Sequence, residues 1–313
     1  MASLARIESE LEHISALSSG RVGVGFLHFE TGARVALGAH ESFPMASTYK
    51  VAIAARLLQR IDAGEFGLDQ MIDIDQNDLS PGGGLVRAHI YHPGLALSIH
   101  NLLALMLTVS DNTSSDMVLQ LAGGAAAVTD FLRAAGIEGM RVDRSTKGLI
   151  TDAYGATALM PDNQWSFQFL QEHRAALSND PPAAAAEVFL ADPRDTSTPA
   201  AMLDLLARIF RRELLSAAST QVLLDIMESC ESGAARIKGL LPAGTVVAHK
   251  TGTIPRISTN DMGIVTLPDG AGHVAISIVV KSPGKGDFTQ REEAERTIAH
   301  LARAVYDFAL FTH

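Results

Sequence analysis

Cysteine is nearly absent from this 313-residue chain, which contains only Cys230. A single cysteine excludes an internal disulfide framework and leaves no cysteine-based metal site. Free cysteine is usually buried, so we expect Cys230 to be a small buried side chain. The eleven histidines are scattered, and the one close pair, His89-x-x-His92, lies beside Pro93 and Gly94 as in a loop. We therefore expect no metal and no cofactor.

Basic charge and long apolar segments are also scarce. The chain has 25 Lys and Arg residues against 35 Asp and Glu, a formal net charge of -10 that opposes binding to nucleic acid. No stretch approaches about 18 consecutive apolar residues, so no membrane span is expected. Residues 1–17 carry Glu8, Glu10, Glu12 and His13 where a signal peptide needs an apolar stretch. The protein is therefore expected to be cytoplasmic or to have lost a leader, and its oligomeric state stays open.

Apolar residues make up 47% of the sequence, enough for a large core. Their spacing predicts helices over 4–17 and 291–311, a β-hairpin over 21–37, and strands over 246–248, 262–267 and 274–280. Between these ends the predicted helices are 51–61, 99–109, 117–121, 128–135, 201–214 and 220–227. The pattern predicts an α+β fold, in which an antiparallel sheet is covered by the terminal helices beside an inserted helical domain. We assign residues 1–42 and 235–313 to the sheet domain and residues 43–234 to the helical domain.

Three short motifs follow one another along the chain: Ser47-Thr48-Tyr49-Lys50, Ser110-Asp111-Asn112 and Lys250-Thr251-Gly252. Each is weak evidence alone, but the ordered set matches the Ser-x-x-Lys, Ser-Asp-Asn and Lys-Thr-Gly signature. On these motifs the chain resembles the class A β-lactamases and penicillin-binding proteins. The resemblance implies the same two-part fold, with an active site in the cleft between the parts and a small-molecule substrate as the partner.

Ser47 and Lys50 supply a nucleophile and a base if a helix starts near Ala46. Residues three apart lie on one helix face, so the Lys50 amine can reach the Ser47 hydroxyl and, when neutral, take its proton. A neutral lysine requires a pKa lowered by burial and by nearby positive charge. Lys250 is the obvious second cation.

The resemblance assigns roles to the other motif residues. Ser110 relays a proton to the leaving nitrogen, and Asn112 binds the substrate's side-chain amide. The segment Lys250-Thr251-Gly252 binds the substrate, with Lys250 and Thr251 on its carboxylate. The backbone N–H groups of Ser47 and Thr253 form the oxyanion hole.

Many relatives carry a carboxylate-binding arginine at the position that Thr259 occupies here, in the triplet Thr259-Asn260-Asp261. Arg236, Arg256 and Lys285 are the candidates to substitute for it. The sequence does not choose among them.

The loop that should carry the deacylating base departs from the family pattern. In class A enzymes an Arg and an Asp pair across the neck of a short Ω-loop, and a Glu two residues after that Arg activates the hydrolytic water. Asp143-Arg144 and Asp192-x-Arg194-Asp195 resemble the two sides of this neck, but Thr146 and Ile150 stand where the Glu and a later Asn belong. Asp195 follows Arg144 by 51 positions, against about 15 in the family, so roughly 36 residues are inserted.

The insert, about residues 145–194, has a pattern of its own. An apolar stretch between Pro161 and Pro181-Pro182 predicts a short amphipathic helix that we interpret as a lid or wall of the cleft; it contains Trp165, Phe167, Phe169, Leu170 and Leu177. The candidates to replace the missing base are Asp152, Asp162, Glu172, Asp180 and Glu187. Glu187 is preferred because Glu187-Val188-Phe189-Leu190 copies the Glu-x-x-Leu of the family motif.

The leading hypothesis is a serine hydrolase of class A β-lactamase type, which opens β-lactam amides through an acyl-enzyme on Ser47. General-base assistance is worth about 10²- to 10⁴-fold in rate, so losing the usual glutamate affects deacylation most. Two alternatives stay open. One is a related acyl-transfer enzyme, such as a D,D-peptidase, esterase or amidase, and the other is a slowly deacylating penicillin-binding protein or sensor.

Overall fold

The structure is a computed structural model that describes residues 3–89, 92, 94–157, 167–173, 177, 180–283 and 291–311. The predictions that concern Asp162, Trp165 and Lys285 lie outside these residues. Within the described ranges, no helix is both long enough and apolar enough to cross a membrane.

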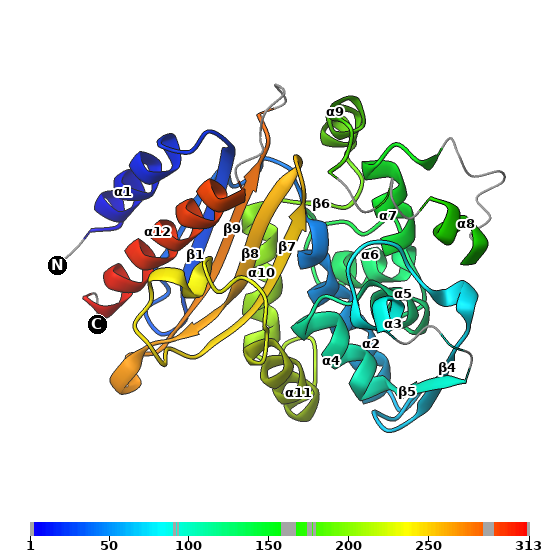
Figure 1. The fold of residues 1–313 in the computed structure, drawn as a ribbon. Helices are drawn as coiled ribbons and strands as arrows, with labels where there is room; N and C mark the ends of the chain where they lie inside the picture. The colour runs from blue at the N-terminus through cyan, green and yellow to red at the C-terminus, as the bar shows by residue number, and fades with distance from the viewer. Residues whose placement is uncertain are drawn as a thin grey trace.

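A five-stranded antiparallel sheet is built from both ends of the chain (Figure 1). Its strands run in the order β2-β1-β9-β8-β7, with bounds β1 Arg21–His28, β2 Arg34–Leu37, β7 Val247–Ile254, β8 Ser258–Thr266 and β9 His273–Lys281. Helices α1 (Leu4–Ala16) and α12 (Arg291–Leu310) lie on one face, and α10 (Pro199–Phe210) lies on the other. The predicted α+β fold is confirmed, as are the hairpin and both terminal helices.

Strand β9 is buried on both faces because it lies in the middle of the sheet. Successive side chains of a strand point to opposite faces. Ile276 and Ile278 pack into the cluster formed with α1 and α12, whereas Ala275 and Val279 pack into the larger core that contains α10. The sheet thus separates two apolar cores.

The helical part lies beside the edge strand β7 (Figure 1). Its helices are η1 Ala46–Tyr49, α2 Lys50–Asp62, η2 Gln76–Asp78, α3 Leu85–His89, α4 Ile99–Thr108, α5 Asn112–Leu121, α6 Ala125–Ala134, α7 Thr146–Ala153, α8 Phe167–Glu172, α9 Ala183–Ala191 and α11 Ala217–Glu228. The short helices η5 (Ile237–Leu240) and η6 (Pro268–Gly270) belong to the sheet side. The six helices predicted for the middle of the chain are present as α2, α4, α5, α6, α10 and α11.

Two small strand pairs were not predicted. They are β3 (Phe43–Pro44) with β6 (Thr196–Ser197), and β4 (Met71–Ile74) with β5 (Leu95–Ser98). Strands of two to four residues are too short to show a clear alternation of apolar and polar positions. The division into two domains at about residues 42 and 235 stays a prediction, and α10 contacts the sheet although it lies within the predicted helical domain.

Candidate active site

Ser47 lies in η1, which packs against β7 and continues directly into α2. The preceding residue, Ala46, has a φ of 47°, in the left-handed region that non-glycine residues rarely adopt. Such strain is concentrated at functional sites, because the surrounding structure must hold it in place. Ser47 is partly exposed and lines a cavity of about 400 Å³. The predicted nucleophile therefore stands at the wall of a substrate-sized space.

Lys50 is fully buried at the first position of α2. Its Nζ donates to Ser110 O at 2.9 Å, to Ser110 Oγ at 3.1 Å and to Asn112 Oδ1 at 3.0 Å. Burial lowers the pKa of Lys50 well below its usual value, and the charge of Lys250 lowers it further. A lysine amine that loses its proton this readily can act as a base. The structure thus joins residues of two motifs that are about sixty positions apart.

Ser110 and Asn112 stand at the start of α5. Ser110 has a φ of 59°, so it is also held in the left-handed region. Asp111 caps α5 by accepting from Ser114 N at 2.7 Å, and it also accepts from Val86 N at 2.9 Å. These two bonds fix the turn that aims Ser110 and Asn112 at Lys50. Asn112 lines the cavity.

Lys250 is fully buried in β7, where its Nζ donates to Thr251 O at 2.9 Å. Burial lowers the pKa of Lys250 to about 8, and Arg236 acts in the same direction, whereas Cys230 and Asp261 oppose the change. The amine is therefore mostly protonated at neutral pH. Its charge also depresses the pKa of Lys50. Lys250 itself does not line the cavity.

Gly252 allows β7 to lie directly against η1. A Cβ at this position would lie 2.6 Å from Met45 O and 3.0 Å from the backbone nitrogens of Ser47 and Thr48. All three contacts are backbone atoms, which cannot move aside cheaply. The close approach brings Thr253 and Ser47 to the same cavity.

Replacing Gly252 by alanine is expected to push β7 away from η1 and to weaken the oxyanion hole that is predicted for the Ser47 and Thr253 N–H groups. Loss of one oxyanion donor typically costs about 10²- to 10³-fold in rate, and we expect a loss of this size in the acylation rate. Gly148→Ala is the matched control, because its Cβ would meet side-chain atoms of Arg144 and Ser145 at ordinary contact distances of 3.5 to 3.8 Å. Stopped-flow acylation of both variants checks the prediction, and equal rates would contradict it.

Of the two candidate arginines, Arg236 is the one that contacts β7. This strand carries the predicted carboxylate-binding residues and is called the substrate strand below. Its guanidinium donates to Gly252 O at 3.1 Å and to Thr253 Oγ1 at 2.6 Å, and it pairs with Glu295 at 3.1 Å. Burial lowers its pKa, while Asp261 and Glu295 favour the charged form. Arg256 instead faces Asp180, with Nε 3.6 Å from the carboxylate.

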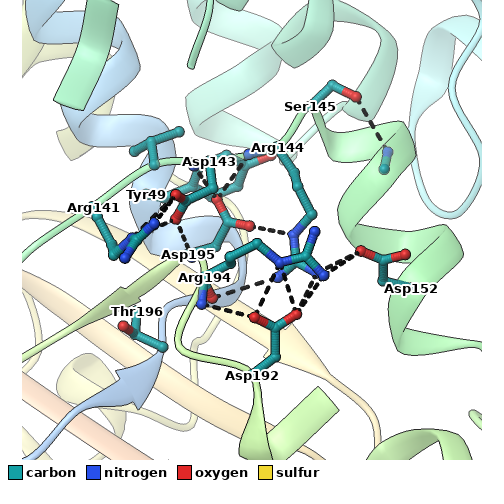
Figure 2. Close-up of polar contacts among 12 residues, drawn as sticks. Tyr49, Arg141, Asp143, Arg144, Ser145, Asp152, Asp192, Arg194, Asp195 and Thr196 are labelled. Atoms are coloured by element: carbon teal, nitrogen blue, oxygen red, sulfur yellow. Dashed lines mark hydrogen bonds and ion pairs between the residues drawn. The ribbon is translucent and has the colours of Figure 1, made fainter. Parts of the chain in front are cut away.

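The neck of the enlarged loop is closed by Arg144, as Figure 2 shows. Its Nε lies 2.5 Å from Asp195 Oδ2, and its Nη1 contacts Asp152 at 2.6 Å and Asp192 at 3.1 Å. The Asp195 carboxylate also accepts from Asp143 N at 2.7 Å. The two sides of the neck recognised in the sequence therefore meet, although 51 positions separate Arg144 from Asp195.

Thr146 occupies the place expected for the deacylating glutamate, at the start of α7. Its Oγ1 lies 2.6 Å from the hydroxyl of Tyr49, inside the Ser-x-x-Lys motif. Its backbone N–H donates to Asp116 at 2.6 Å, and the N–H of Lys147 donates to the same carboxylate at 3.1 Å. This position lines the cavity together with Ile150. A short hydroxyl therefore replaces an ionisable side chain.

Among the described residues that line the cavity there is no Asp or Glu. Glu187 lies on the exposed face of α9, outside that lining, so its position does not support the predicted role as base. Asp152 is held in the neck by Arg144 and Arg194. The other two described candidates for the base also lie outside the lining: Glu172 accepts from Gln168 at 2.8 Å, and Asp180 faces Arg256.

The cavity has an apolar wall, of which the sequence predicted only Leu177, as part of the lid or wall contributed by the insert. The apolar wall consists of Leu149, Ile150, Tyr154, Leu177 and Ile254. Three of these residues belong to α7 or the turn after it, and α7 was not predicted as a helix. Its sequence signal is the N-cap Ser145, which accepts from Gly148 N at 3.1 Å.

Fold and site together define a serine hydrolase, in which the predicted nucleophile Ser47 is followed three residues later by the buried Lys50. A sequence model described as the β-lactamase enzyme family matches residues 6–309, so the chain belongs to that family.

Individual relatives agree over nearly the whole chain. The β-lactamase VEB-1 of Pseudomonas aeruginosa is 27% identical over 308 residues, which cover 96% of this chain and 89% of the relative. The crystal structure of the TLA-1 extended-spectrum β-lactamase is 26% identical with a TM-score of 0.79, covering 99% of this chain and 100% of the other. An ancestral class A β-lactamase, GNCA, is 30% identical with a TM-score of 0.76, covering 96% and 99%. The fold is thus that of class A β-lactamases.

Proposed function

We propose that the protein opens β-lactam amides by transferring their acyl group to Ser47. The single observation that carries this proposal is the buried amine of Lys50. It lies three residues after Ser47, where η1 continues into α2, and it donates hydrogen bonds to Ser110 and Asn112. Its lowered pKa makes it a base in a site where the nucleophile faces a cavity of about 400 Å³. The relatives VEB-1 and TLA-1, which are named as β-lactamases, support the substrate class.

In the proposed first step, Lys50 takes the Ser47 hydroxyl proton while Oγ attacks the β-lactam carbonyl carbon. The N–H groups of Ser47 and Thr253 stabilise the negative charge that develops on the carbonyl oxygen. The C–N bond of the ring then breaks, and Ser110 passes a proton to the departing nitrogen. Asn112 would bind the amide of the substrate's side chain.

The substrate's carboxylate is proposed to bind at β7. Lys250 and Thr251 would hold it, with Gly252 allowing the close approach of the strand. Arg236 supports this end of the site because it contacts Gly252 O and Thr253 Oγ1. We assign it, rather than Arg256, as the cation that substitutes for the family's arginine.

A second candidate function follows from the described cavity lining, which contains no carboxylate. Without a base to activate water, the ester on Ser47 would be released about 10²- to 10⁴-fold more slowly than with one. A long-lived acyl-enzyme would make the protein a penicillin-binding sensor rather than a fast hydrolase. Acylation is common to both functions, so the rate of release decides between them.

The deciding experiment follows a chromogenic cephalosporin by absorbance and by intact-protein mass spectrometry. Wild type is expected to form one covalent adduct, and Ser47→Ala is expected to form none and to show no burst. Sustained turnover would identify a hydrolase, and an adduct that lasts for minutes would identify a sensor. A chromogenic ester and a D-Ala-D-Ala peptide serve as comparison substrates. Absence of both turnover and adduct would refute the β-lactam proposal.

Binding of a substrate carboxylate is expected to weaken as the pH rises through about 8, because Lys250 loses its proton there. The amine is charged below this pKa and neutral above it, so affinity is highest on the acidic side. We expect KM for a penicillin to rise by up to about tenfold per pH unit above that point. A chromogenic ester without a carboxylate is the control, since its KM should not follow Lys250. A parallel rise for both substrates would contradict the assignment.

A further inference from the structure

Cys230, the only cysteine of the chain, lies beside a buried histidine–aspartate pair behind the substrate strand. His249, on β7, has its Nδ1 at 3.0 Å from Asp261 Oδ1 on β8, and both side chains are fully buried. An Nδ1–H that donates to the carboxylate sets the role of the other ring nitrogen. That atom, Nε2, is buried without a hydrogen-bond partner among the described residues. The charge of the imidazole acts on the Cys230 thiol, so a carboxylate-oriented imidazole and the thiol share one buried environment.

The charges around Cys230 favour its thiolate. Burial alone would raise its pKa, but His249 and Lys250 on β7 and the hydroxyl of Ser232 lower it to about 7. Asp261 and Cys230 raise the pKa of His249 to about 9 against the opposing effect of burial. From η5, Lys238 donates its Nζ to Cys230 O at 3.5 Å. Between about pH 7 and 9 the dyad therefore holds a thiolate and an imidazolium, the reactive form of a cysteine.

A chain of hydrogen bonds connects Cys230 to the substrate strand. Cys230 Sγ lies 3.4 Å from Ser232 Oγ, which lies 2.6 Å from Thr251 Oγ1. The residue after Ser232 is also tightly packed, because a Cβ on Gly233 would lie 2.4 Å from Thr251 Cγ2. Because Ser232 Oγ lies against the sulfur, a group added to the sulfur is expected to displace Ser232. In the proposed function, Thr251 helps to bind the substrate's carboxylate.

We propose that Cys230 is a thiol-modification site for small disulfide-type reagents, and that a group attached to its sulfur disturbs substrate binding at Thr251 through Ser232. The thiolate attacks the outer sulfur of the reagent, a new S–S bond forms, and the other half leaves as a thiolate or sulfinate. Cys230 is 7% exposed, which limits the site to small reagents. The effect on substrate binding rests on the proposed function, whereas the reaction of the thiol does not.

The first experiment measures the reaction itself, using methyl methanethiosulfonate and intact-protein mass spectrometry across pH 6 to 9. One methylthio group is expected on folded wild type, with a rate that levels off above pH 7, whereas an ordinary thiol levels off above about 8.5. His249→Gln should shift this profile towards that of an ordinary thiol and slow the reaction at pH 7 by roughly 3- to 10-fold. Reaction only after unfolding, or a profile that His249→Gln leaves unchanged, would overturn the proposal.

The second experiment measures the consequence for the active site. Acylation of wild type by a fluorescent penicillin is expected to fall at least about tenfold after modification and to return when dithiothreitol removes the group. Cys230→Ser is compared with its own untreated sample and should not respond to the reagent. Full modification with unchanged acylation would refute the coupling.

The two readouts also separate this inference from the proposed function. If the unmodified enzyme does not react with penicillins at all, the proposed function fails. Formation of the adduct on Cys230 is still measurable and tests the reactivity of the thiol independently. In that case the thermal midpoint reports the coupling, because displacement of Ser232 from Thr251 should lower it for modified wild type. Ser232→Ala lacks a hydroxyl that lowers the pKa of Cys230, so it is first modified to completion at the upper end of the pH range. It should then lose this difference in midpoint, and an unchanged difference would overturn the route through Ser232.

Discussion

Replacing Thr146 by glutamate is expected to speed release of the acyl group from Ser47 by about 10²- to 10⁴-fold, the usual contribution of a general base. Position 146 lines the cavity and belongs to the N-terminus of α7, whose backbone is fixed by Asp116. A carboxylate there would line the same cavity as the Ser47 ester. The substitution sacrifices one hydrogen bond to Tyr49.

Single-turnover decay of the acyl-enzyme, followed by mass spectrometry, measures this effect. Thr146→Gln is the matched control, because it has the size of glutamate but cannot accept a proton from water. We expect the control to deacylate no faster than wild type. A glutamate variant whose ester persists as long as that of the control would show that the loop holds position 146 in an unproductive place. Rapid decay in wild type itself would show that a base already exists elsewhere.

Removing the Asp195 charge is expected to destabilise the protein by about 3 to 5 kcal/mol, the cost of breaking a buried ion pair. In Asp195→Asn the guanidinium of Arg144 loses its closest carboxylate, and the N–H groups of Asp143 and Arg144 lose a charged acceptor. The change leaves Asp152 and Asp192 as partners of Arg144. They occupy the other side of its guanidinium and do not replace the bonds at the neck.

Urea unfolding of Asp195→Asn and of Asp204→Asn tests this expectation. Asp204 pairs with Arg34 at 2.9 Å, but both side chains are 40% exposed, so this pair should contribute no more than about 1 kcal/mol. Similar losses in the two variants would mean that the neck stabilises no more than a surface ion pair. Because the neck closes a long loop, we also expect Asp195→Asn to be cleaved by protease within residues 145–194 before the rest of the chain.

The sequence was most informative where chemistry and local pattern coincide. The spacing of Ser47 and Lys50 predicted a nucleophile beside a base, and the structure places that base at Ser110 and Asn112. The neck was recognisable because Arg144 and Asp195 bracket the insert. The hairpin and terminal helices followed from apolar periodicity, which is a local property of the chain.

The insert was less predictable because its contacts are not local. Glu187 was chosen for its sequence context, yet the buried residues of its helix are Ala186 and Phe189, which turn the carboxylate outward. The hydrogen bond between Tyr49 and Thr146 joins residues 97 positions apart, and no pattern in either segment predicts it. Which acid of a long insert reaches a cleft depends on packing that a single sequence does not reveal.

The pairing of β1 with β9 means that the central sheet cannot be completed until most of the chain has been synthesised. Arg21 lies opposite Lys281, so one edge of β1 stays unpaired until β9 has been synthesised. At about 5 to 20 residues per second, ribosomal synthesis of the intervening chain takes roughly 13 to 52 s. During that time β2 is the only strand of the sheet that can pair with β1, and an unpaired strand edge favours association with other chains. A chaperone that protects the nascent N-terminal hairpin should therefore improve the yield of folded protein more than one that acts after release.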